Sequence, residues 1–482
     1  MTTSSPDRPS SPLHPYAGRF DVHPVMPEQG VARDQLLDEL GQMSREEDAK
    51  ADAGRVSGSI YSGDHEHYAF LADAFEHFAH ANVLQRDMYP SATKMESEII
   101  AMTAELMHGD ATIADPDDPD KVGGLVTSGG TESLVTAMLA YREWGRRTKG
   151  IERAHVVMPV TGHPAMRKAF HWFDMDVTLV PVDADQRADV AAMEAAITPS
   201  TVALVGSAGT YPHGVVDPIT ELGRLALDRG IGLHVDGCLG GLILCWADDL
   251  GYTSPPWDFR VPGVSSISAD THKYGYGFKG SSVLLFRPVS WRREQYAVFH
   301  GWPGGAYSSP GMSGSRSGGL IAATWAAMLS LGKAGYRTIA ADIFRTAAAV
   351  KDAVRSHPEL MLLGDSLFNI AVAASPAVEH PIDIFHVVDG LAARGWRMNG
   401  LQLPPAFHFC ITRPNTRPGV VEAFAADLAA AVADAAQPDL GPPRSGAMYG
   451  SGGRVVDPQR VAAGTAAFLD AVHEVGPVGR GR

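Results

Sequence analysis

The stretch SADTHKYGYGFKGSS, residues 268–282, decides how the rest of the chain is interpreted. It places Lys273 directly after Thr271 and His272, in a run of small residues between two short apolar segments. Such a lysine is either the solvated end of a strand or an amine held partly out of water. An amine that forms a Schiff base must be partly desolvated and close to neutral, unlike a surface lysine. The stretch alone does not separate the two cases, so the decision depends on its surroundings.

Short apolar strands alternate with helices on both sides of this stretch, over residues 121–331. The strand candidates are residues 124–127, 155–159, 177–181, 201–207, 232–236, 265–268 and 282–286, and helical patterns fall at 131–147 and 217–229. This alternation predicts an α/β fold, with a mostly parallel central sheet and helices on both of its faces.

The flanking regions have different patterns, and they suggest four parts. We expect a disordered tail (1–30), an N-terminal helical segment (31–120), a large domain (121–334) and a smaller α+β C-terminal domain (335–475). In the helical segment, residues 34–43 have apolar residues at helical spacing. A second helix has Met95, Ile99, Met102 and Leu106 on one face and stops at Gly109. A Pro- and Gly-rich linker spans residues 437–446.

Composition excludes several classes of partner. The chain has 40 basic and 55 acidic residues and a formal charge of −15, which argues against binding to nucleic acid or to an anionic membrane. Three cysteines without a CxxC motif suit a reducing cytoplasm. Residues 1–16 lack the apolar core of a signal peptide or anchor, and the longest apolar stretch, residues 239–246, is too short for an integral membrane segment. We therefore expect a cytoplasmic protein.

A glycine-containing loop follows the first predicted strand and begins a helix. Its residues Ser128, Gly129, Gly130 and Thr131 are placed where a helix N-terminus can receive an anion. The spacing is neither GxGxxG nor GxxxxGK[ST], which disfavours a nucleotide. A Gly-Gly turn at the start of a helix is common, so this loop is weak evidence by itself.

Two more polar residues fall at predicted strand ends. Asp236 closes a strand in HVDGCLGG (234–241), and His163 follows another in TGHPAMRK (161–168). Separately, these residues could be a helix cap and a surface histidine. Pyridoxal phosphate (PLP) needs a carboxylate at its pyridine nitrogen, and His163 would lie flat on its ring. Together with the loop and Lys273 they occur in the chain order of fold-type I PLP enzymes, so we predict that PLP is the cofactor.

The chain further resembles the sphingosine-1-phosphate lyase branch of the group II decarboxylase-like PLP enzymes. The resemblance extends over residues 57–472 and rests on the runs DMYP (87–90), KMESEII (94–100), TSGGTES (127–133), YPHGVVDP (211–218), HVDGCLGG (234–241), SADTHKYGY (268–276), KGSS (279–282), GGAY (304–307), SGSRSGGL (313–320) and SGAMYG (445–450).

The resemblance implies a role for each matching residue. Lys273 would be the Schiff-base lysine, Asp236 would pair with the pyridinium, and His163 would stack on the ring. His272 would help hold the cofactor phosphate together with the Ser128–Thr131 loop. The substrate's own phosphate would be held by a second set, partly from the neighbouring subunit: Tyr61, Asn82, Tyr211, Lys279 and Ser315, with Arg316 alongside. A homodimer with shared active sites is thus implied.

One departure from the family concerns Gln85. The family has Asn-Pro-Leu-His where this chain has Asn82, Val83, Leu84 and Gln85. Glutamine donates a hydrogen bond but cannot titrate or carry charge. Phosphate binding could therefore be weaker, or the substrate could have a different head group.

The resemblance implies retro-aldol cleavage of a phosphorylated long-chain amino alcohol to a fatty aldehyde and phosphoethanolamine, with Lys273 or Tyr211 returning a proton. PLP alone does not choose this outcome, because the bond held perpendicular to its ring is the one that breaks. The alternatives are an amino-acid decarboxylase, an aldolase-type lyase on an unphosphorylated or short β-hydroxy amine, and a non-catalytic relative.

Two other groups have simpler interpretations. The histidines at 65, 67, 77 and 80 have imperfect spacing for a metal, so we expect a polar helix face and no metal site. Cys238 is two residues after Asp236, and we expect a packed cysteine rather than a reactive thiol.

Overall fold

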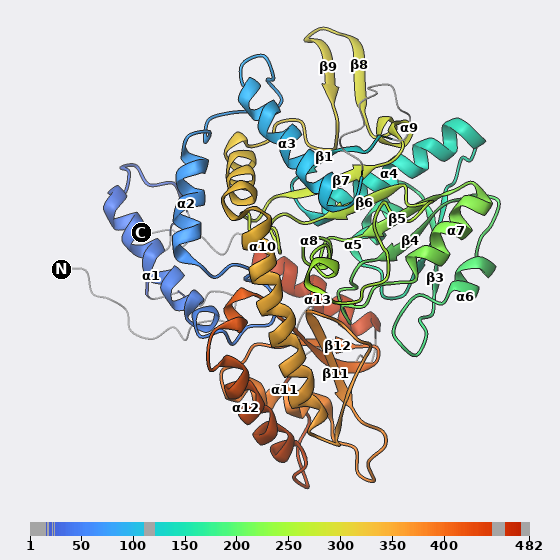
Figure 1. Ribbon diagram of the computed structural model, residues 1–482. Coiled ribbons are helices and arrows are strands. Elements are labelled where there is room, and N and C mark those ends of the chain that lie inside the picture. The colour runs from blue at the N-terminus through green and yellow to red at the C-terminus, as the bar shows by residue number, and fades with distance from the viewer. Residues whose placement is uncertain are drawn as a thin grey trace.

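The computed structural model describes residues 16, 19–21, 23, 25–109, 121–445 and 458–473, and a seven-stranded sheet forms its centre (Figure 1). The strand order is β1-β7-β6-β5-β4-β2-β3. Only β7 runs against the other described strands of this sheet, since it pairs antiparallel with both β1 and β6. The mostly parallel sheet that the sequence predicts is therefore confirmed.

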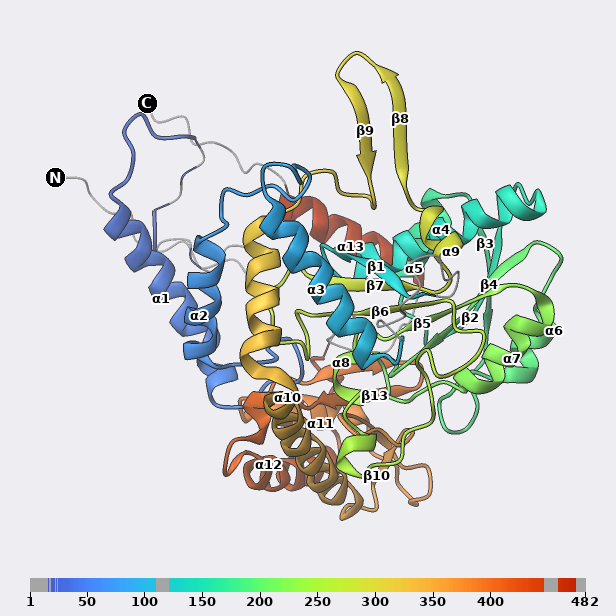
Figure 2. The ribbon, with the colours of Figure 1, turned by 45° about the horizontal axis from the view of Figure 1, so that its top comes forward.

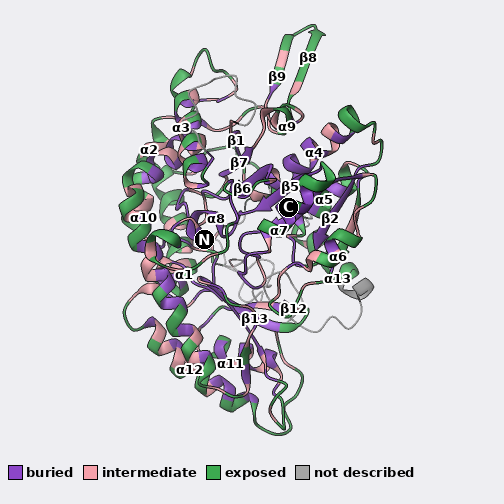
Figure 3. Ribbon diagram, turned by 45° about the vertical axis from the view of Figure 1, so that its right-hand side comes forward, coloured by how far each residue is buried: buried purple, intermediate pink, exposed green. Residues whose placement is uncertain are grey.

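Each predicted strand lies within one residue of an observed one. The strands are β1 (Gly123–Thr127), β2 (His155–Pro159), β3 (Asp176–Val180), β4 (Thr201–Ser207), β5 (Gly232–Asp236), β6 (Ser266–Ala269) and β7 (Ser282–Phe286). Every residue of β2, β4, β5, β6 and β7 is buried, as Figure 3 shows for the centre of the sheet. Strands buried on both faces have uninterrupted apolar sequences, which is why the apolar runs located them.

Helices cover both faces of the sheet. Alternate residues of β2 point to opposite faces: Val156 and Met158 pack in one hydrophobic cluster with α4 (Gly130–Lys149) and α5 (Ala165–Trp172). Val157 packs in another cluster with residues of α3 (Pro90–Leu106) and α7 (Ile219–Arg229). Shorter elements complete this part: α6 (Val190–Ala195), α8 (Gly241–Leu244), η1 (Asp248–Leu250) and α9 (Val289–Arg293).

The N-terminal region is helical, as predicted. Helix α3 buries Met95 and Ile99 and ends at Leu106, and the N–H of Gly109, the predicted stop, donates to the carbonyl of Ala104 at 2.8 Å. Before it come α1 (Arg33–Asp52) and α2 (His65–Glu76). Helix α1 is longer than the predicted segment 34–43, and its Leu36, Leu37 and Leu40 are exposed in the described chain.

A smaller α+β unit follows the large sheet. Helix α10 (Gly318–Arg355), which breaks at Gly332 with φ 54°, leads into a four-stranded antiparallel sheet. Its strands and neighbouring helices are β10 (Leu360–Leu362), β11 (Asn369–Ala374), α11 (Ile384–Ala393), β12 (Asn399–Gln402), β13 (Pro405–Cys410), η2 (Arg413–Thr416), α12 (Val420–Ala435) and α13 (Pro458–His473). A separate hairpin, β8 (Ala297–Trp302) and β9 (Gly305–Ser309), projects from the body (Figure 2).

The division into four parts stays a prediction. Helix α10 crosses the expected boundary at residues 334 and 335, close to its break. The predicted tail falls mostly outside the described residues, although the Tyr16 hydroxyl donates to Glu47 on α1 at 2.7 Å. Residues 446–450 of the SGAMYG run also lie outside the described part.

Candidate active site

Lys273 lines a cavity of about 290 Å³ at the carboxyl ends of the sheet strands. The large domain contributes His163, which follows β2, and Tyr211, which follows β4. The C-terminal unit and the segment before α2 close the other sides. The full lining is Gly58, Ser59, Tyr61, His163, Tyr211, Leu239, Lys273, Lys279, Arg397, Asn399, His408 and Cys410.

Lys273 lies in the turn after β6 and pairs with Asp270. Its Nζ is 2.7 Å from Oδ2 of Asp270, whose side chain is 2% exposed. Burial by itself would lower the pKa of Lys273, but the Asp270 carboxylate holds it well above its usual value. The same pair holds the pKa of Asp270 below its usual value against the effect of burial. The sequence predicts a partly desolvated amine close to neutral, whereas the Asp270 counter-ion favours the charged form of this buried lysine.

Asp236 is the last residue of β5 and is buried at 7% exposure. Its Oδ1 accepts the backbone N–H of Cys238 at 3.1 Å, which fixes the carboxylate at the end of the strand. Cys238 itself is buried, and burial raises the pKa of its thiol well above the usual range. A buried, protonated thiol is a poor nucleophile, which favours the packed role predicted for it.

His163 and Tyr211 lie on neighbouring loops, with their rings 6.1 Å apart at 90°. The backbone N–H of Ala165 donates to Nδ1 of His163 at 3.2 Å, and burial lowers the pKa of this histidine. A neutral ring with its lone pair at Nδ1 carries its proton at Nε2. The backbone carbonyl of Tyr211 accepts from Asn369 at 2.9 Å, so the C-terminal unit helps to position this tyrosine.

The loop from Ser128 to Thr131 begins α4, as predicted. Gly129 has φ 141°, and a Cβ on Gly130 would lie 2.7 Å from an oxygen of Asp270, so glycine is required where the loop passes that carboxylate. Glu132 closes the loop by accepting the Ser128 N–H at 2.7 Å. The first N–H groups of a helix have no acceptor within it, and here they can receive a phosphate.

His272 lies beside this loop. Its Nδ1 is 2.6 Å from the carbonyl of Ser281 and its Nε2 is 3.7 Å from Asp270. Burial lowers the pKa of His272. The imidazole is therefore fixed between β7 and the loop where a phosphate would bind.

Tyr61 and Lys279 form the side of the cavity nearest to α2. The Lys279 Nζ lies 4.9 Å from the centre of the Tyr61 ring. Burial raises the pKa of Tyr61 well above its usual value, so its hydroxyl stays protonated and can donate. Lys279 keeps an exposed surface, but desolvation by the surrounding protein and then the charge of Lys273 lower its pKa to about 8.

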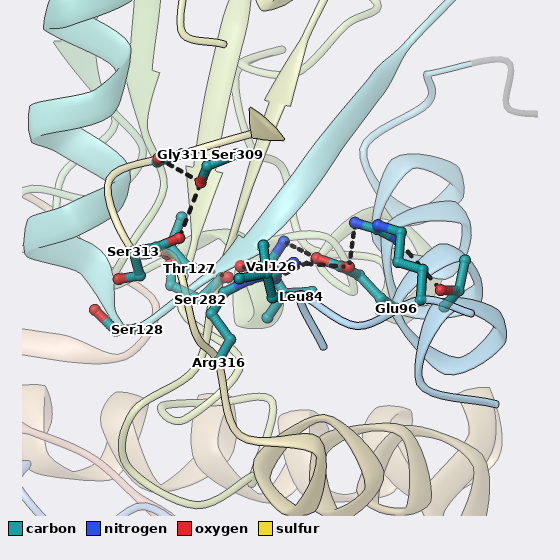
Figure 4. A network of polar contacts seen from close by, with 12 residues as sticks. Leu84, Glu96, Val126, Thr127, Ser128, Ser282, Ser309, Gly311, Ser313 and Arg316 are labelled. Atoms are coloured by element: carbon teal, nitrogen blue, oxygen red, sulfur yellow. Dashed lines mark hydrogen bonds and ion pairs between the residues drawn. The ribbon is translucent and has the colours of Figure 1, made fainter. Parts of the chain in front are cut away.

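The remaining predicted residues form a second cluster, with no member in the lining of the Lys273 cavity. Asn82 donates to Ser315 Oγ at 3.1 Å, and Gln85 is exposed. The Arg316 guanidinium contacts both oxygens of Glu96 and donates to the Val126 carbonyl at 2.9 Å (Figure 4). Its charge is therefore already balanced by a buried carboxylate, which disfavours the phosphate contact expected for Arg316. Arg316 and Ser315 do line a smaller cavity of about 160 Å³ beside Ser128.

Sequence reasoning missed Asp270 and the residues that the C-terminal unit brings to the cavity. Asp270 belongs to the same stretch as Lys273. Its position three residues before the lysine could have indicated an ion pair between the two side chains. Arg397, Asn399 and His408 line the cavity more than 120 residues after Lys273 in the chain, and nothing local marks them. No group of three or more metal-binding side chains gathers within the described residues.

The residues present fit pyridoxal phosphate. A lysine amine and an imidazole line one cavity, a buried carboxylate ends the neighbouring strand β5, and a helix N-terminus with two glycines lies beside Asp270. Such a set can hold an amine-reactive aldehyde, a pyridine nitrogen and a phosphate at once. Fold and site together define a PLP-dependent enzyme of the open α/β class.

Comparison with known proteins places the chain within that class. Residues 58–370 match the pyridoxal-dependent decarboxylase conserved domain. The chain is 38% identical to sphingosine-1-phosphate lyase 1 of Rattus norvegicus over 96% of its own length and 79% of the relative's. It is 41% identical to the sphingosine-1-phosphate lyase of Arabidopsis thaliana over 86% and 76%. The chain belongs to the sphingosine-1-phosphate lyase family.

Solved structures agree with this assignment. The sphingosine-1-phosphate lyase of Burkholderia pseudomallei K96243 superposes with a TM-score of 0.88 at 47% identity, covering 95% of this chain and 99% of that one. Glutamate decarboxylase of Lactobacillus brevis CGMCC 1306 superposes with a TM-score of 0.73 at 19% identity over 89% and 99%, which shows the shared fold alone. No helix among the described residues combines the length and apolarity needed to cross a bilayer.

Proposed function

We propose that this protein is a PLP-dependent carbon–carbon lyase that cleaves sphingosine 1-phosphate or a closely similar phosphorylated amino alcohol. The products are a fatty aldehyde and phosphoethanolamine. The observation that carries this proposal is the similarity to sphingosine-1-phosphate lyases over nearly the whole chain, combined with one cavity that contains Lys273, His163 and two further cations. A decarboxylase is less supported, because the decarboxylases compared share the fold at low identity.

Each residue around the cavity has a defined task in this proposal. Lys273 would hold the cofactor through its amine, Asp236 would pair with the pyridine nitrogen, and His163 would pack against the ring. Ser128, Gly129, Gly130 and Thr131 bind the cofactor phosphate with His272. When bound, the cofactor supplies a sink for the electron pair that is released as the substrate Cα–Cβ bond breaks.

The side chains of the protein must carry out two proton transfers in this reaction. A base takes the proton of the substrate β-hydroxyl, and an acid returns a proton to Cα after the aldehyde leaves. His163 is disfavoured as the base, because its Nδ1 accepts from Ala165 and its Nε2 carries the proton. Tyr211 and Lys273 line the same cavity, and either can return the proton to Cα.

We also propose a homodimer in the cytoplasm. The second cluster, with Asn82 and Ser315, does not line the cavity of its own Lys273, as expected if it serves the site of a partner subunit. The three cysteines are free thiols, which suits a reducing compartment.

Product analysis tests the reaction. The PLP-loaded enzyme is incubated with sphingosine 1-phosphate, with unphosphorylated β-hydroxy amines and with amino acids, and aldehyde and carbon dioxide are measured. We expect aldehyde from the phosphorylated substrate, and a colourless, inactive Lys273→Ala variant. Carbon dioxide from an amino acid, with no aldehyde from any β-hydroxy amine, would show that the enzyme is a decarboxylase.

A further inference from the structure

Arg397 is fixed beside the segment that contains Tyr61, although the two are more than 330 residues apart in sequence. Its backbone N–H donates to the Arg55 carbonyl at 2.8 Å, and its carbonyl accepts the Ser57 N–H at 2.9 Å. These bonds hold Arg397 where its side chain lines the same cavity as Lys273 and Lys279.

The guanidinium of Arg397 is held by neutral groups. Its Nη1 lies 3.3 Å from Asn399 Oδ1 and 3.5 Å from Ser59 Oγ. Asn399 is buried at 6% exposure, and its Nδ2 is 3.0 Å from His408 Nε2 and 3.2 Å from the Ser57 carbonyl. Asn399 can thus orient Arg397 toward the cavity without neutralising its charge.

Arg397 and Lys279 both line the cavity, and both contact the short segment of residues 59–61. Arg397 is next to Ser59, and Lys279 is over the ring of Tyr61, two residues further on. Ser59 itself is exposed and has φ 63°, a left-handed conformation that turns the segment sharply. Among the described residues, no carboxylate lies within ion-pair distance of either cation. Two positive charges without a direct ion pair therefore line this cavity, and the buried Asp270 carboxylate acts on Lys279 from beyond ion-pair distance.

We propose that Arg397, together with Ser59, forms the second half of the site that binds the substrate's phosphate, opposite Tyr61 and Lys279. A phosphate monoester carries close to two negative charges at neutral pH, and two cations with two hydroxyls match it in charge and in hydrogen-bond donors. A guanidinium binds phosphate through paired N–H donors, which also fixes its orientation. Arg397 is thus a specificity-determining residue that selects phosphorylated over unphosphorylated amino alcohols.

This inference rests on the proposed lyase function and changes the expectation drawn from Gln85. Gln85 removes a titratable group that relatives have at that position, so weaker phosphate binding was expected. Gln85 is exposed and belongs to the second cluster, which we assign to a partner's cavity, and it brings no charge there, whereas Arg397 lines the cavity of its own Lys273. In this proposal, the Arg397 guanidinium of the C-terminal unit supplies a permanent positive charge that binds the substrate's phosphate.

The test compares substrate preference and direct phosphate binding in Arg397→Gln, Arg397→Lys and the wild type. We expect Arg397→Gln to lower the preference for sphingosine 1-phosphate over sphingosine, measured as the ratio of kcat/KM values, by about tenfold to a hundredfold, mainly through KM. Arg397→Lys should recover part of this loss. Arg345→Gln, which removes an exposed guanidinium from α10, is the matched control and should keep the wild-type ratio.

A second measurement separates this inference from the proposed function. Inorganic phosphate is titrated into the PLP-loaded enzyme, where the cofactor fills the loop at residues 128–131, and binding is followed by calorimetry. We expect at least tenfold weaker binding in Arg397→Gln, with unchanged cofactor absorbance and Tm. Equal phosphate affinity in both proteins, or an equal loss of kcat/KM for both substrates, would overturn the role of Arg397. A wild type that releases no aldehyde but shows Arg397-dependent phosphate binding would overturn the lyase function alone.

Discussion

At the residue scale, the ion pair between Asp270 and Lys273 governs the protonation of the lysine amine. An opposite charge within 4 Å stabilises an ammonium, whereas burial favours the neutral amine that reacts with an aldehyde. The 2.7 Å pair therefore favours the charged form of Lys273. Oδ1 of Asp270 is buried without a hydrogen-bond partner among the described residues, and Lys273 is the nearer of the two cationic side chains, with His272 at 3.7 Å, that stabilise the carboxylate.

Replacing Asp270 with asparagine should make Lys273 reactive at lower pH. Loss of the carboxylate leaves burial as the dominant effect, so the pKa of Lys273 should fall. The measurement is the pH dependence of borohydride trapping of PLP on Lys273, followed by mass spectrometry. Asp248→Asn, at an exposed ion pair with Arg260, is the control. An unchanged pH midpoint in Asp270→Asn would contradict the role of this pair.

The pKa of Lys279 predicts how phosphate binding changes with pH. Lys279 is a cation below its pKa of about 8 and becomes neutral above it, so anion affinity should fall as pH rises through that value. Lys279→Arg stays charged throughout. Calorimetric titration of inorganic phosphate into the PLP-loaded enzyme between pH 7.5 and pH 9.5 should therefore show weakening, about tenfold at most, in the wild type and little change in the arginine variant. A parallel decline in both proteins would assign the pH dependence to another group.

At the element scale, the strands were predictable and their order was not. Uninterrupted apolar runs such as residues 201–207 and 282–286 locate buried strands, because both faces need apolar residues. The antiparallel placement of β7 between β1 and β6 depends on contacts between distant segments, which no local pattern records. The hairpin β8–β9 was missed because Val298, Phe299 and Trp302 are exposed and show no alternation between a buried and a solvated face.

The candidate site, like the fold, was predictable where its residues follow predicted strands and not where they depend on contacts between distant segments. Lys273, Asp236, His163 and the loop at 128–131 follow strands, so their meeting at one edge of the sheet follows from parallel topology. Asp270 and Arg397 were not predictable in this way. The first depends on the shape of a turn, and the second comes from a different part of the fold.

The ion pair between Glu96 and Arg316 joins α3 to β1 and to the start of α10, and its loss should destabilise the fold. Glu96 is 4% exposed and also accepts the Val126 N–H at 3.3 Å. Arg316→Met leaves this carboxylate with only its longer pair to the exposed Arg86 at 3.4 Å, so we expect a loss of up to about 3 kcal/mol in the free energy of unfolding. The double variant with Glu96→Gln should be less destabilised than Arg316→Met alone. Urea denaturation gives the free energy of unfolding of Arg316→Met, of Glu96→Gln and of the double variant. A double variant whose loss equals the sum of the two single losses would exclude coupling between the two side chains.

At the scale of the whole molecule, the two clusters of predicted site residues face different surroundings. Lys273, Tyr61 and Lys279 share one cavity, whereas Asn82 and Ser315 bond to each other elsewhere. The homodimer proposed above would account for this, because a two-fold interface can bring the second cluster of one subunit to the cavity of the other. The exposed apolar residues of α1 and of the β8–β9 hairpin provide surface for such an interface.

Mixing two inactive variants tests whether the active sites are shared. Lys273→Ala removes the cofactor lysine, and Asn82→Asp keeps the acceptor oxygen used by Leu84 and Arg316 while adding a negative charge that repels phosphate. In a mixed dimer, the Lys273 of one subunit meets the Asn82 of the other, so one of its two sites is intact. Unfolding and refolding an equal mixture should restore about a quarter of wild-type activity, since half of the dimers are mixed. If each subunit completes its own site, the mixture stays as inactive as its components, whatever the oligomeric state found by light scattering.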